Sequence, residues 1–88
     1  MITAKVTFRG KRKYYSHYRP MIKIREDNMY NSCELIFINQ ESVDSEEGVK
    51  ANIIFLAEEY VTNYLHVGKS FLLYEGSNIV GEGEIISI

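Results

Sequence analysis

Residues 71–83 read FLLYEGSNIVGEG, and this stretch decides the fold. Its apolar ends flank Glu75-Gly76-Ser77-Asn78, whose residues tolerate the positive φ of a tight turn, so the stretch predicts a β-hairpin. In the returning strand, Ile79–Ile88, Gly81 and Gly83 share one face. Missing side chains at alternate positions let a neighbouring backbone or a large ring come close, as at the corner of a small barrel.

The dominant period along the rest of the chain is two, which is typical of β-strands. Basic and aromatic residues 10–16 and acidic residues 39–48 interrupt the pattern and are expected to form surface loops. The near-helical spacing of Leu56, Tyr60 and Tyr64 predicts a short helix over 57–66. About six strands, most of them antiparallel, predict an all-β fold, a small six-stranded antiparallel β-barrel that is closed or nearly closed. The expected strands are Ile2–Arg9, Met21–Arg25, Cys33–Ile38, Val49–Leu56, Phe71–Tyr74 and Ile79–Ile88.

A chain of 88 residues, 45% of them apolar, is expected to form one domain over residues 1–88. A core of this size stabilises a fold only marginally, so a partner or self-association would help. The single Cys33 excludes an intramolecular disulfide and supplies too few ligands for zinc, which favours a reducing compartment. The longest apolar run, Ile53–Ala57, is far below a membrane span. We expect a cytoplasmic protein without a membrane anchor.

Charge is divided unevenly along the sequence. Residues 1–25 carry eight Lys and Arg and no acid, whereas residues 26–88 carry two lysines and all twelve acids. Such asymmetry marks either an anion-binding surface or basic and acidic surfaces that meet within the fold or between copies. The sequence leaves these two interpretations open.

Two segments resemble the third, C-terminal β-barrel domain of elongation factor Tu and related translational GTPases. Residues 17–25, HYRPMIKIR, are similar to the family's Gly-Tyr-Arg-Pro followed by a strand that ends in Arg. Residues 68–83, GKSFLLYEGSNIVGEG, are similar to its Phe-x-x-Arg-Glu-Gly-Gly-Arg-Thr-Val-Gly-x-Gly. The order and spacing also agree. The resemblance implies a six-stranded antiparallel barrel without catalysis that docks on other domains, on an exchange factor and on the T-stem of aminoacyl-tRNA.

The chain departs from that family at its functional positions. It lacks a Gly-x-x-x-x-Gly-Lys-Ser/Thr loop, so we expect no nucleotide binding and no GTPase activity. Met21 replaces the family's Gln, and Tyr74 replaces its Arg before Glu-Gly. In the last turn, Ser77 and Asn78 replace Gly and Arg. The residues that form the barrel are kept, whereas most expected tRNA contacts are not.

The segment 9–19 is the first candidate contact surface because it combines fixed positive charges with tyrosines. Cations that neutralise phosphates and rings that stack on bases suit single-stranded or looped RNA, and the same charges suit an acidic protein partner. Within it, Arg19 is also expected to pair with an acid of the last strand, such as Glu82 or Glu84. The candidate residues are Arg9, Lys11, Arg12, Lys13, Tyr14, Tyr15, Tyr18 and Arg19.

A second candidate is an apolar docking patch on the two strands that are apolar on both faces. Its residues are Ile36, Ile38, Ile54, Leu56, Tyr60 and Tyr64. The alternative is that the segment 57–67 covers this patch.

No catalytic signature appears in the sequence. Cys33, His17 and His66 are scattered, Cys33 is expected in the core, and the glutamate pairs are expected to be solvated. We therefore expect no catalytic residues, no metal and no cofactor. The sequence favours a non-enzymatic interaction module that binds a protein partner or a second copy of itself. RNA binding through segment 9–19 is the alternative.

Overall fold

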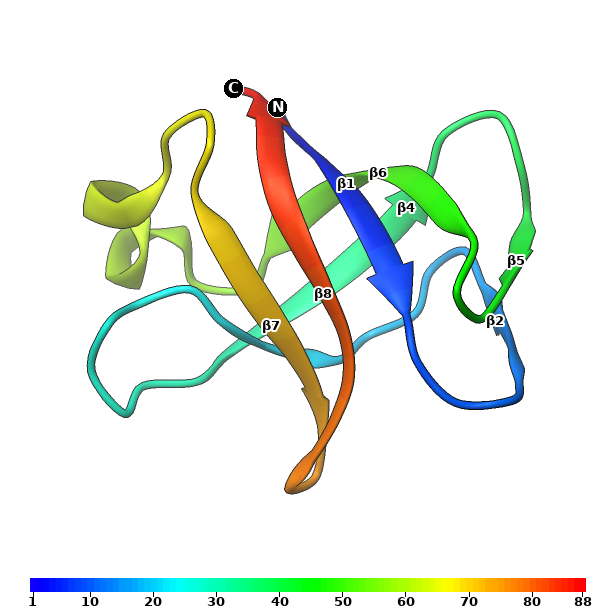
Figure 1. Cartoon of the computed structure of the whole chain (residues 1–88). Coiled ribbons are helices and arrows are strands. Elements are labelled where there is room, and N and C mark those ends of the chain that lie inside the picture. Colours follow the sequence, from blue (N-terminus) through cyan, green and yellow to red (C-terminus); the bar gives the residue numbers. More distant parts are fainter.

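The computed structural model describes all residues from Met1 to Ile88. It contains eight β-strands and two short 3-10 turns (Figure 1). In chain order these are β1 (Ile2–Phe8), β2 (Lys13–Tyr15), β3 (Met21–Lys23), β4 (Asn31–Phe37), β5 (Ser42–Asp44), β6 (Gly48–Phe55), η1 (Glu58–Tyr60), η2 (Thr62–Tyr64), β7 (Ser70–Glu75) and β8 (Asn78–Ser87).

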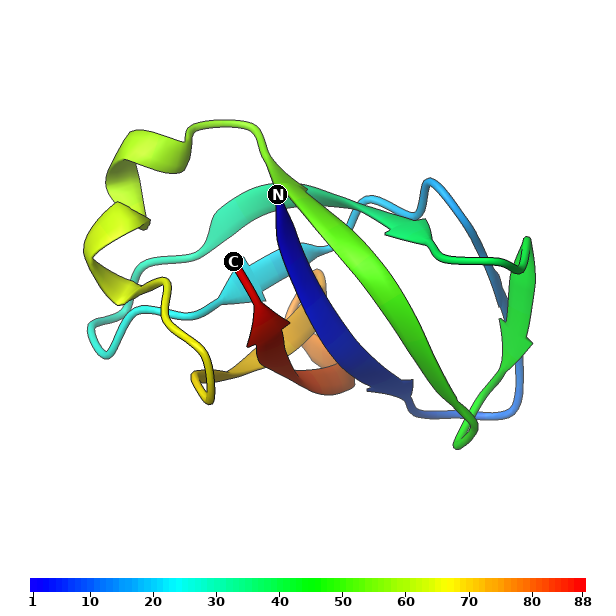
Figure 2. The same ribbon diagram turned by 90° about the horizontal axis from the view of Figure 1, so that it is seen from above.

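Six of the strands close into an antiparallel barrel in the order β1-β6-β4-β3-β7-β8, with β8 paired back to β1. This confirms the all-β barrel expected from the sequence, and each expected strand contributes one barrel strand. Figure 2 looks down on the barrel and shows the two chain ends side by side. Closure leaves no strand edge in the barrel unpaired.

The alternation expected from the sequence directs one face of each strand into the barrel. Along β1, Ala4, Val6 and Phe8 are fully buried. Leu35 on β4 and Leu73 on β7 are fully buried as well, and together they form one contiguous core. Their outward neighbours are polar or partly exposed, so each strand has one core face and one surface face.

The two glycines of β8 let the barrel close. A Cβ atom on Gly81 would lie 2.9 Å from the carbonyl oxygen of Thr7, and one on Gly83 would lie 2.8 Å from that of Lys5. The same atom on Gly83 would lie 2.4 Å from Cζ of Phe71. The absent side chains therefore admit both the β1 backbone and an aromatic ring, as the sequence predicts.

The two segments expected to be loops of opposite charge pair with each other. The basic segment forms β2 and the acidic one forms β5, and the two build a separate two-stranded ribbon (Figure 1). Lys13 lies opposite Asp44, and their side chains form an ion pair of 3.3 Å. The sequence prediction of two simple loops is wrong here, because strands of three residues are too short to show a period.

The helix expected over 57–66 is replaced by the two consecutive 3-10 turns η1 and η2. Val61 between them is fully buried, whereas Leu56 and Tyr60 are exposed, so the buried stripe that the spacing suggested does not exist. The hydroxyl of Thr62 donates to the carbonyl of Glu58 at 2.8 Å. A β-branched pair at Val61 and Thr62 disfavours a longer helix. The structure has no helix with the length and apolar character needed to cross a membrane.

Replacing Gly83 with alanine tests barrel closure. The added methyl group must displace the Phe71 ring or the β1 backbone. We expect Gly83→Ala to destabilise the fold by about 2 kcal/mol, which lowers the melting temperature of a domain of this size by roughly 10 °C. The matched control is Gly48→Ala, where the new atom meets only the flexible end of Lys5 at 3.5 Å. Equal melting temperatures of the two variants in thermal circular dichroism would contradict this account of closure.

Candidate functional site

Aromatic and cationic side chains of the basic segment stack over one end of the barrel. The ring of Tyr14 lies 4.1 Å from the ring of Phe8 and nearly parallel to it. The guanidinium carbon of Arg12 lies 4.3 Å from the centre of the Tyr14 ring on its other side. The Tyr14 hydroxyl donates to the carbonyl of Arg9 at 2.9 Å, and the residue is only 2% exposed. Tyr14 therefore closes the barrel end and offers no face for a base or a partner.

Glu75 binds the second tyrosine and the arginine of this stack. The Tyr18 hydroxyl donates to one Glu75 oxygen, and Arg12 donates to the carboxylate at 3.3 and 3.4 Å. These two donors lower the pKa of Glu75, and the hydrogen bond from Tyr18 has the larger effect of the two. Burial, with the Glu75 carboxylate as a further cause, raises the pKa of Tyr18. Tyr18 and Arg12 thus act as structural partners of an acid at the end of β7.

Arg9 and Lys13 of the segment are also paired with acids. Arg9 donates to Glu82 at 3.0 Å, and Lys13 pairs with Asp44. Because Arg9, and not Arg19, meets the last strand, the expected pairing of Arg19 with Glu82 or Glu84 is wrong. Arg9 directly follows β1, the neighbour of β8, whereas the segment that carries Arg19 runs beside β4 through a bridge between Tyr18 and Leu35.

Arg19 has a different environment from the other arginines. It lies 3.6 Å from one oxygen of Glu34, while the other oxygen lies 2.7 Å from the Nδ1 atom of His17. The guanidinium of Arg19 donates no hydrogen bond within the protein, and its side chain is 76% exposed. Its hydrogen-bonding capacity is therefore largely free.

Two further residues of the basic segment, one in the loop before β2 and one at the end of β2, remain open to solvent. Lys11 is exposed and pairs with no acid, and Tyr15 is 62% exposed. Of the eight candidate contact residues in segment 9–19, only Lys11, Tyr15 and Arg19 therefore keep side chains that are free to contact a partner.

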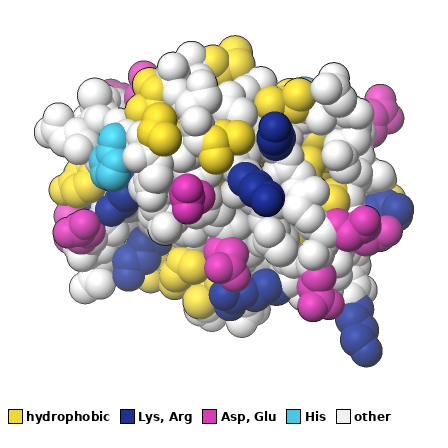
Figure 3. All heavy atoms as spheres, turned by 45° about the horizontal axis from the view of Figure 1, so that its top comes forward, with side chains coloured by type: hydrophobic (Ala, Val, Ile, Leu, Met, Phe, Trp, Pro, Cys, Tyr) yellow, Lys and Arg dark blue, Asp and Glu magenta, His cyan; other side chains and the backbone are white.

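The four aliphatic residues of the second candidate surface lie on the outer face of β4 and β6 or directly after these strands. Ile54 and Leu56 are 48% and 83% exposed, and Ile36 and Ile38 are half-buried. Glu34 lies opposite Ile54, so apolar and polar side chains alternate across the strand pair. In Figure 3 hydrophobic side chains gather mainly in the upper half of the view, over the end of the barrel where the chain termini lie.

A groove runs along this face. It has a volume of about 440 Å³, and Ile54 and Leu56 line it together with Arg19 and Glu34. Buried Cys33 and Phe55 also border it. The structure therefore joins one residue of the basic segment to two residues of the apolar patch, although the sequence places them at least 35 positions apart.

The two tyrosines assigned to the apolar patch contact another part of the molecule. The guanidinium of Arg25 lies 5.3 Å from the centre of the Tyr64 ring and donates to the carbonyl of Tyr60 at 3.2 Å. Arg25 also pairs with Asp27 at 2.5 Å. Tyr60 and Tyr64 thus hold the 3-10 turns against the segment after β3, and neither lines the groove that contains Leu56.

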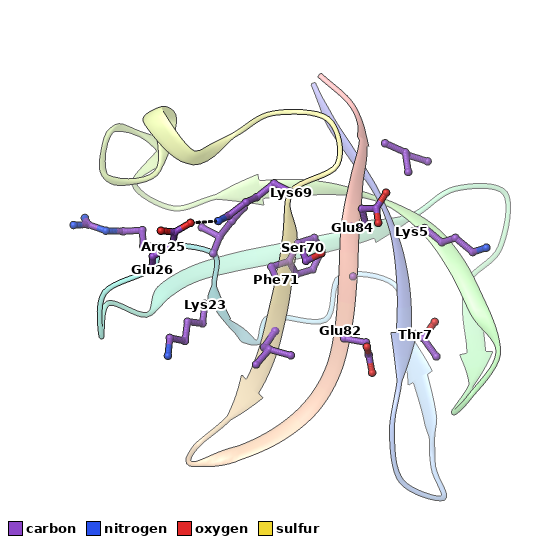
Figure 4. Close-up of a pocket in the computed structure, with 14 residues that line it drawn as sticks. Lys5, Thr7, Lys23, Arg25, Glu26, Lys69, Ser70, Phe71, Glu82 and Glu84 are labelled. Carbon is purple, nitrogen blue, oxygen red and sulfur yellow. Dashed lines mark hydrogen bonds and ion pairs between the residues drawn. The ribbon is translucent and has the colours of Figure 1, made fainter.

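A larger cleft of about 750 Å³ lies on the outer face of β1, β7 and β8 (Figure 4). Glu82 and Glu84 project from β8, and Lys69 crosses one side to reach Glu26 at 3.3 Å. Lys5 lines the opposite side of the cleft. Both acids and bases line this cleft, so it presents no single charge to a ligand.

The residues with catalytic potential are separated. Cys33 is buried, and burial raises the pKa of its thiol to about 12, so it carries almost no thiolate at neutral pH. No group of three or more His, Cys, Asp and Glu residues is arranged to hold a metal ion. His17 meets Glu34 at the surface, and His66 contacts a backbone carbonyl.

Sequence reasoning did not find the acids that neutralise the basic segment. Glu34 was assigned to an apolar strand and Glu75 to a turn, and both are partners of residues 12–19. The net charge of −2 in a chain with a basic N-terminal part was the available signal that acids elsewhere would face it.

No protein-family model matches this chain, and no curated protein matches it either. The fold and the contacts of its side chains are therefore the grounds for assigning a function.

The Glu75 cluster predicts a pH dependence of stability. Because the pKa of Glu75 is lowered in the folded state, its contribution is present above the ordinary value of 4.5 and is lost as the pH falls through the lower folded value. We expect Glu75→Gln to lower the melting temperature at pH 7 by a few degrees. The corresponding loss in the free energy of unfolding is less than about 1 kcal/mol, because the Glu75 side chain is half exposed. The difference from wild type should shrink below about pH 4.5.

Thermal unfolding from pH 3 to pH 7 measures this effect, with Glu41→Gln as the control because the Glu41 side chain is exposed and has no ion pair. A difference between wild type and Glu75→Gln that grows as the pH falls would show that the lowered pKa is wrong.

Proposed function

We propose that this chain is a non-enzymatic interaction module, built on a barrel like the third domain of elongation factor Tu, and that it binds a protein partner or a second copy of itself. The observation that carries the proposal is the pair of exposed aliphatic side chains, Ile54 and Leu56, beside a groove on the outer face of β4 and β6. Exposed apolar groups rimmed by charge are typical of protein docking sites.

The pattern of free charge favours a protein over a nucleic acid. Five cations of the chain lie within 3.3 Å of an acid, namely Arg9, Arg12, Lys13, Arg25 and Lys69, whereas Arg19 lies 3.6 Å from Glu34 and donates no hydrogen bond to it. The lysines without an acid partner are Lys5, Lys11, Lys23 and Lys50; Lys5 and Lys50 lie opposite each other on β1 and β6, and Lys11 and Lys23 lie on other segments. Nucleic-acid surfaces need several free cations along one track, and this barrel has no such track.

Replacing Leu56 with aspartate tests the docking surface. Leu56 follows β6, is 83% exposed and makes little contribution to the core, so Leu56→Asp should change stability by no more than about 0.5 kcal/mol. We expect the change to reduce specific protein capture from ribonuclease-treated lysate of the source cells at least tenfold, or to abolish concentration-dependent self-association in sedimentation velocity. A charge at the centre of an apolar contact is costly to desolvate.

The matched control is Ile79→Asp, which places the same charge on an exposed apolar position beside the β7–β8 turn. Equal capture and equal self-association by wild type and Leu56→Asp would overturn the assignment of this surface.

RNA binding through the basic segment is the second candidate function, favoured by exposed Tyr15 and unpaired Lys11 on the same segment. Because few cations there are free, we expect weak binding to a labelled single-stranded RNA. A plot of the logarithm of the RNA-binding constant against the logarithm of the salt concentration should have a slope of about 2 or less in magnitude. Fluorescence anisotropy of wild type and Tyr15→Ala between 50 and 300 mM salt measures it. A slope of about 4 or more, with affinity lost in Tyr15→Ala, would place RNA first.

A further inference from the structure

We infer that the groove between Arg19 and Leu56 recognises a protein segment that presents a carboxylate side chain next to an aliphatic one. This inference rests on the proposed function and specifies the chemistry of the partner. Three features of the groove support it: a free guanidinium, an acid that holds this guanidinium in place, and an apolar wall.

The guanidinium of Arg19 is available for a ligand. Arg9, Arg12 and Arg25 all donate hydrogen bonds to acceptors within the protein. Arg19 donates none, and it is the most exposed of the arginines that form ion pairs. A planar guanidinium binds a carboxylate through two parallel hydrogen bonds, so an incoming acid gains both strength and a defined orientation.

Glu34 positions Arg19 without saturating it. Its side chain is 22% exposed, and one of its oxygens is engaged by His17 at 2.7 Å. The other oxygen lies 3.6 Å from Arg19, which is close enough for attraction and too long for a good hydrogen bond. The guanidinium is therefore held at the mouth of the groove while its donors stay free.

The apolar wall selects the neighbouring side chain of the partner. Ile54 and Leu56 line the same groove as Arg19; Ile54 is about half exposed and Leu56 is largely open to solvent. An aliphatic side chain of the partner would cover them and gain about 25 cal/mol for each Å² of apolar area removed from water. A groove of about 440 Å³ accommodates a few side chains, which is the scale of a short segment.

A polyanion fits this groove less well than a peptide does. A phosphate chain needs several cations along its length, whereas Arg19 is the one cation that lines the groove, and Ser32, Ile54 and Leu56 add no positive charge. A single carboxylate matched to a single free guanidinium is the charge pattern that the groove complements.

Selection from a phage-displayed library of random 12-residue peptides on the immobilised full chain tests the inference. We expect the wild type to enrich peptides with Asp or Glu within three positions of Leu, Ile, Val or Phe. Arg19→Glu should reverse the preference to Lys or Arg, because the new acid attracts a cation. Lys11→Glu makes the same charge change at an exposed site outside the groove and should leave the preference unchanged. Melting temperatures verify that each variant is folded.

A synthetic peptide with the enriched sequence then measures how much the carboxylate contributes to the binding affinity. Replacing its acid by the amide should weaken binding to the wild type about tenfold or more, and the replacement should have no effect on binding to Arg19→Ala. No enrichment, or an acidic preference that survives Arg19→Glu, would overturn the inference. So would RNA binding that depends on Arg19 without any selected peptide.

The two proposals fail in different ways. If Leu56→Asp abolishes protein capture but the library shows no preference for acids, protein docking stands and recognition of a carboxylate falls. If Leu56→Asp changes neither capture nor self-association, the surface itself is wrong and both fall.

Discussion

The close approach of β8 to β1 is the constraint on which the rest of the structure depends. Gly81 and Gly83 bring the last strand so near to the first that a side chain at either position would meet a carbonyl oxygen of β1. Closure pairs the backbone groups along all six barrel strands, so strand addition, a common way to bind a peptide, has no barrel edge to use. A partner of the barrel must therefore be recognised by side chains on the outer faces of the strands, and this directs attention to β4 and β6.

Electrostatic pairing within the chain is the second organising feature. The basic N-terminal part and the acidic remainder fold onto one another, as the pairs Arg9–Glu82, Arg12–Glu75 and Lys13–Asp44 show. Each exposed pair contributes little to stability. Their joint effect on function is larger, because charges already neutralised within the fold add little to the attraction for a polyanion. A segment that looks like a nucleic-acid motif in the sequence is thus mainly a structural cover for the barrel end, with Tyr14 stacked on Phe8 at its centre.

The barrel could be predicted from the sequence because its strands are long enough to show a period and because Gly81 and Gly83 mark a close approach. The β2–β5 ribbon could not, since strands of three residues carry no period and their pairing joins positions about thirty residues apart. The helix prediction was wrong because spacing alone does not tell which residue is buried, and it is Val61 that packs inward. The prediction that Arg19 pairs with an acid of the last strand was also wrong. The order of neighbouring strands in the barrel decides which acid lies near Arg19, and the sequence does not reveal that order. Of the groove, Arg19, Ile54 and Leu56 were predicted as contact residues, but Glu34 and the meeting of these residues were not.

The freedom of Arg19 depends on the conformation of its neighbour His17. His17 has a φ of 76°, in the left-handed region that residues other than glycine seldom adopt, and its backbone N–H donates to the carbonyl of Leu35 at 2.8 Å. This turn directs the imidazole to Glu34, where its Nδ1 atom approaches one carboxylate oxygen. Without the imidazole, both oxygens of Glu34 would be open to a bidentate pair with Arg19, the geometry that Arg and carboxylate prefer. The strained residue His17 thus binds one oxygen of Glu34, and as a result the guanidinium of Arg19 at the groove keeps its hydrogen-bond donors free. Strain of this kind persists where the surrounding structure holds it in place, and it tends to lie at sites with a function.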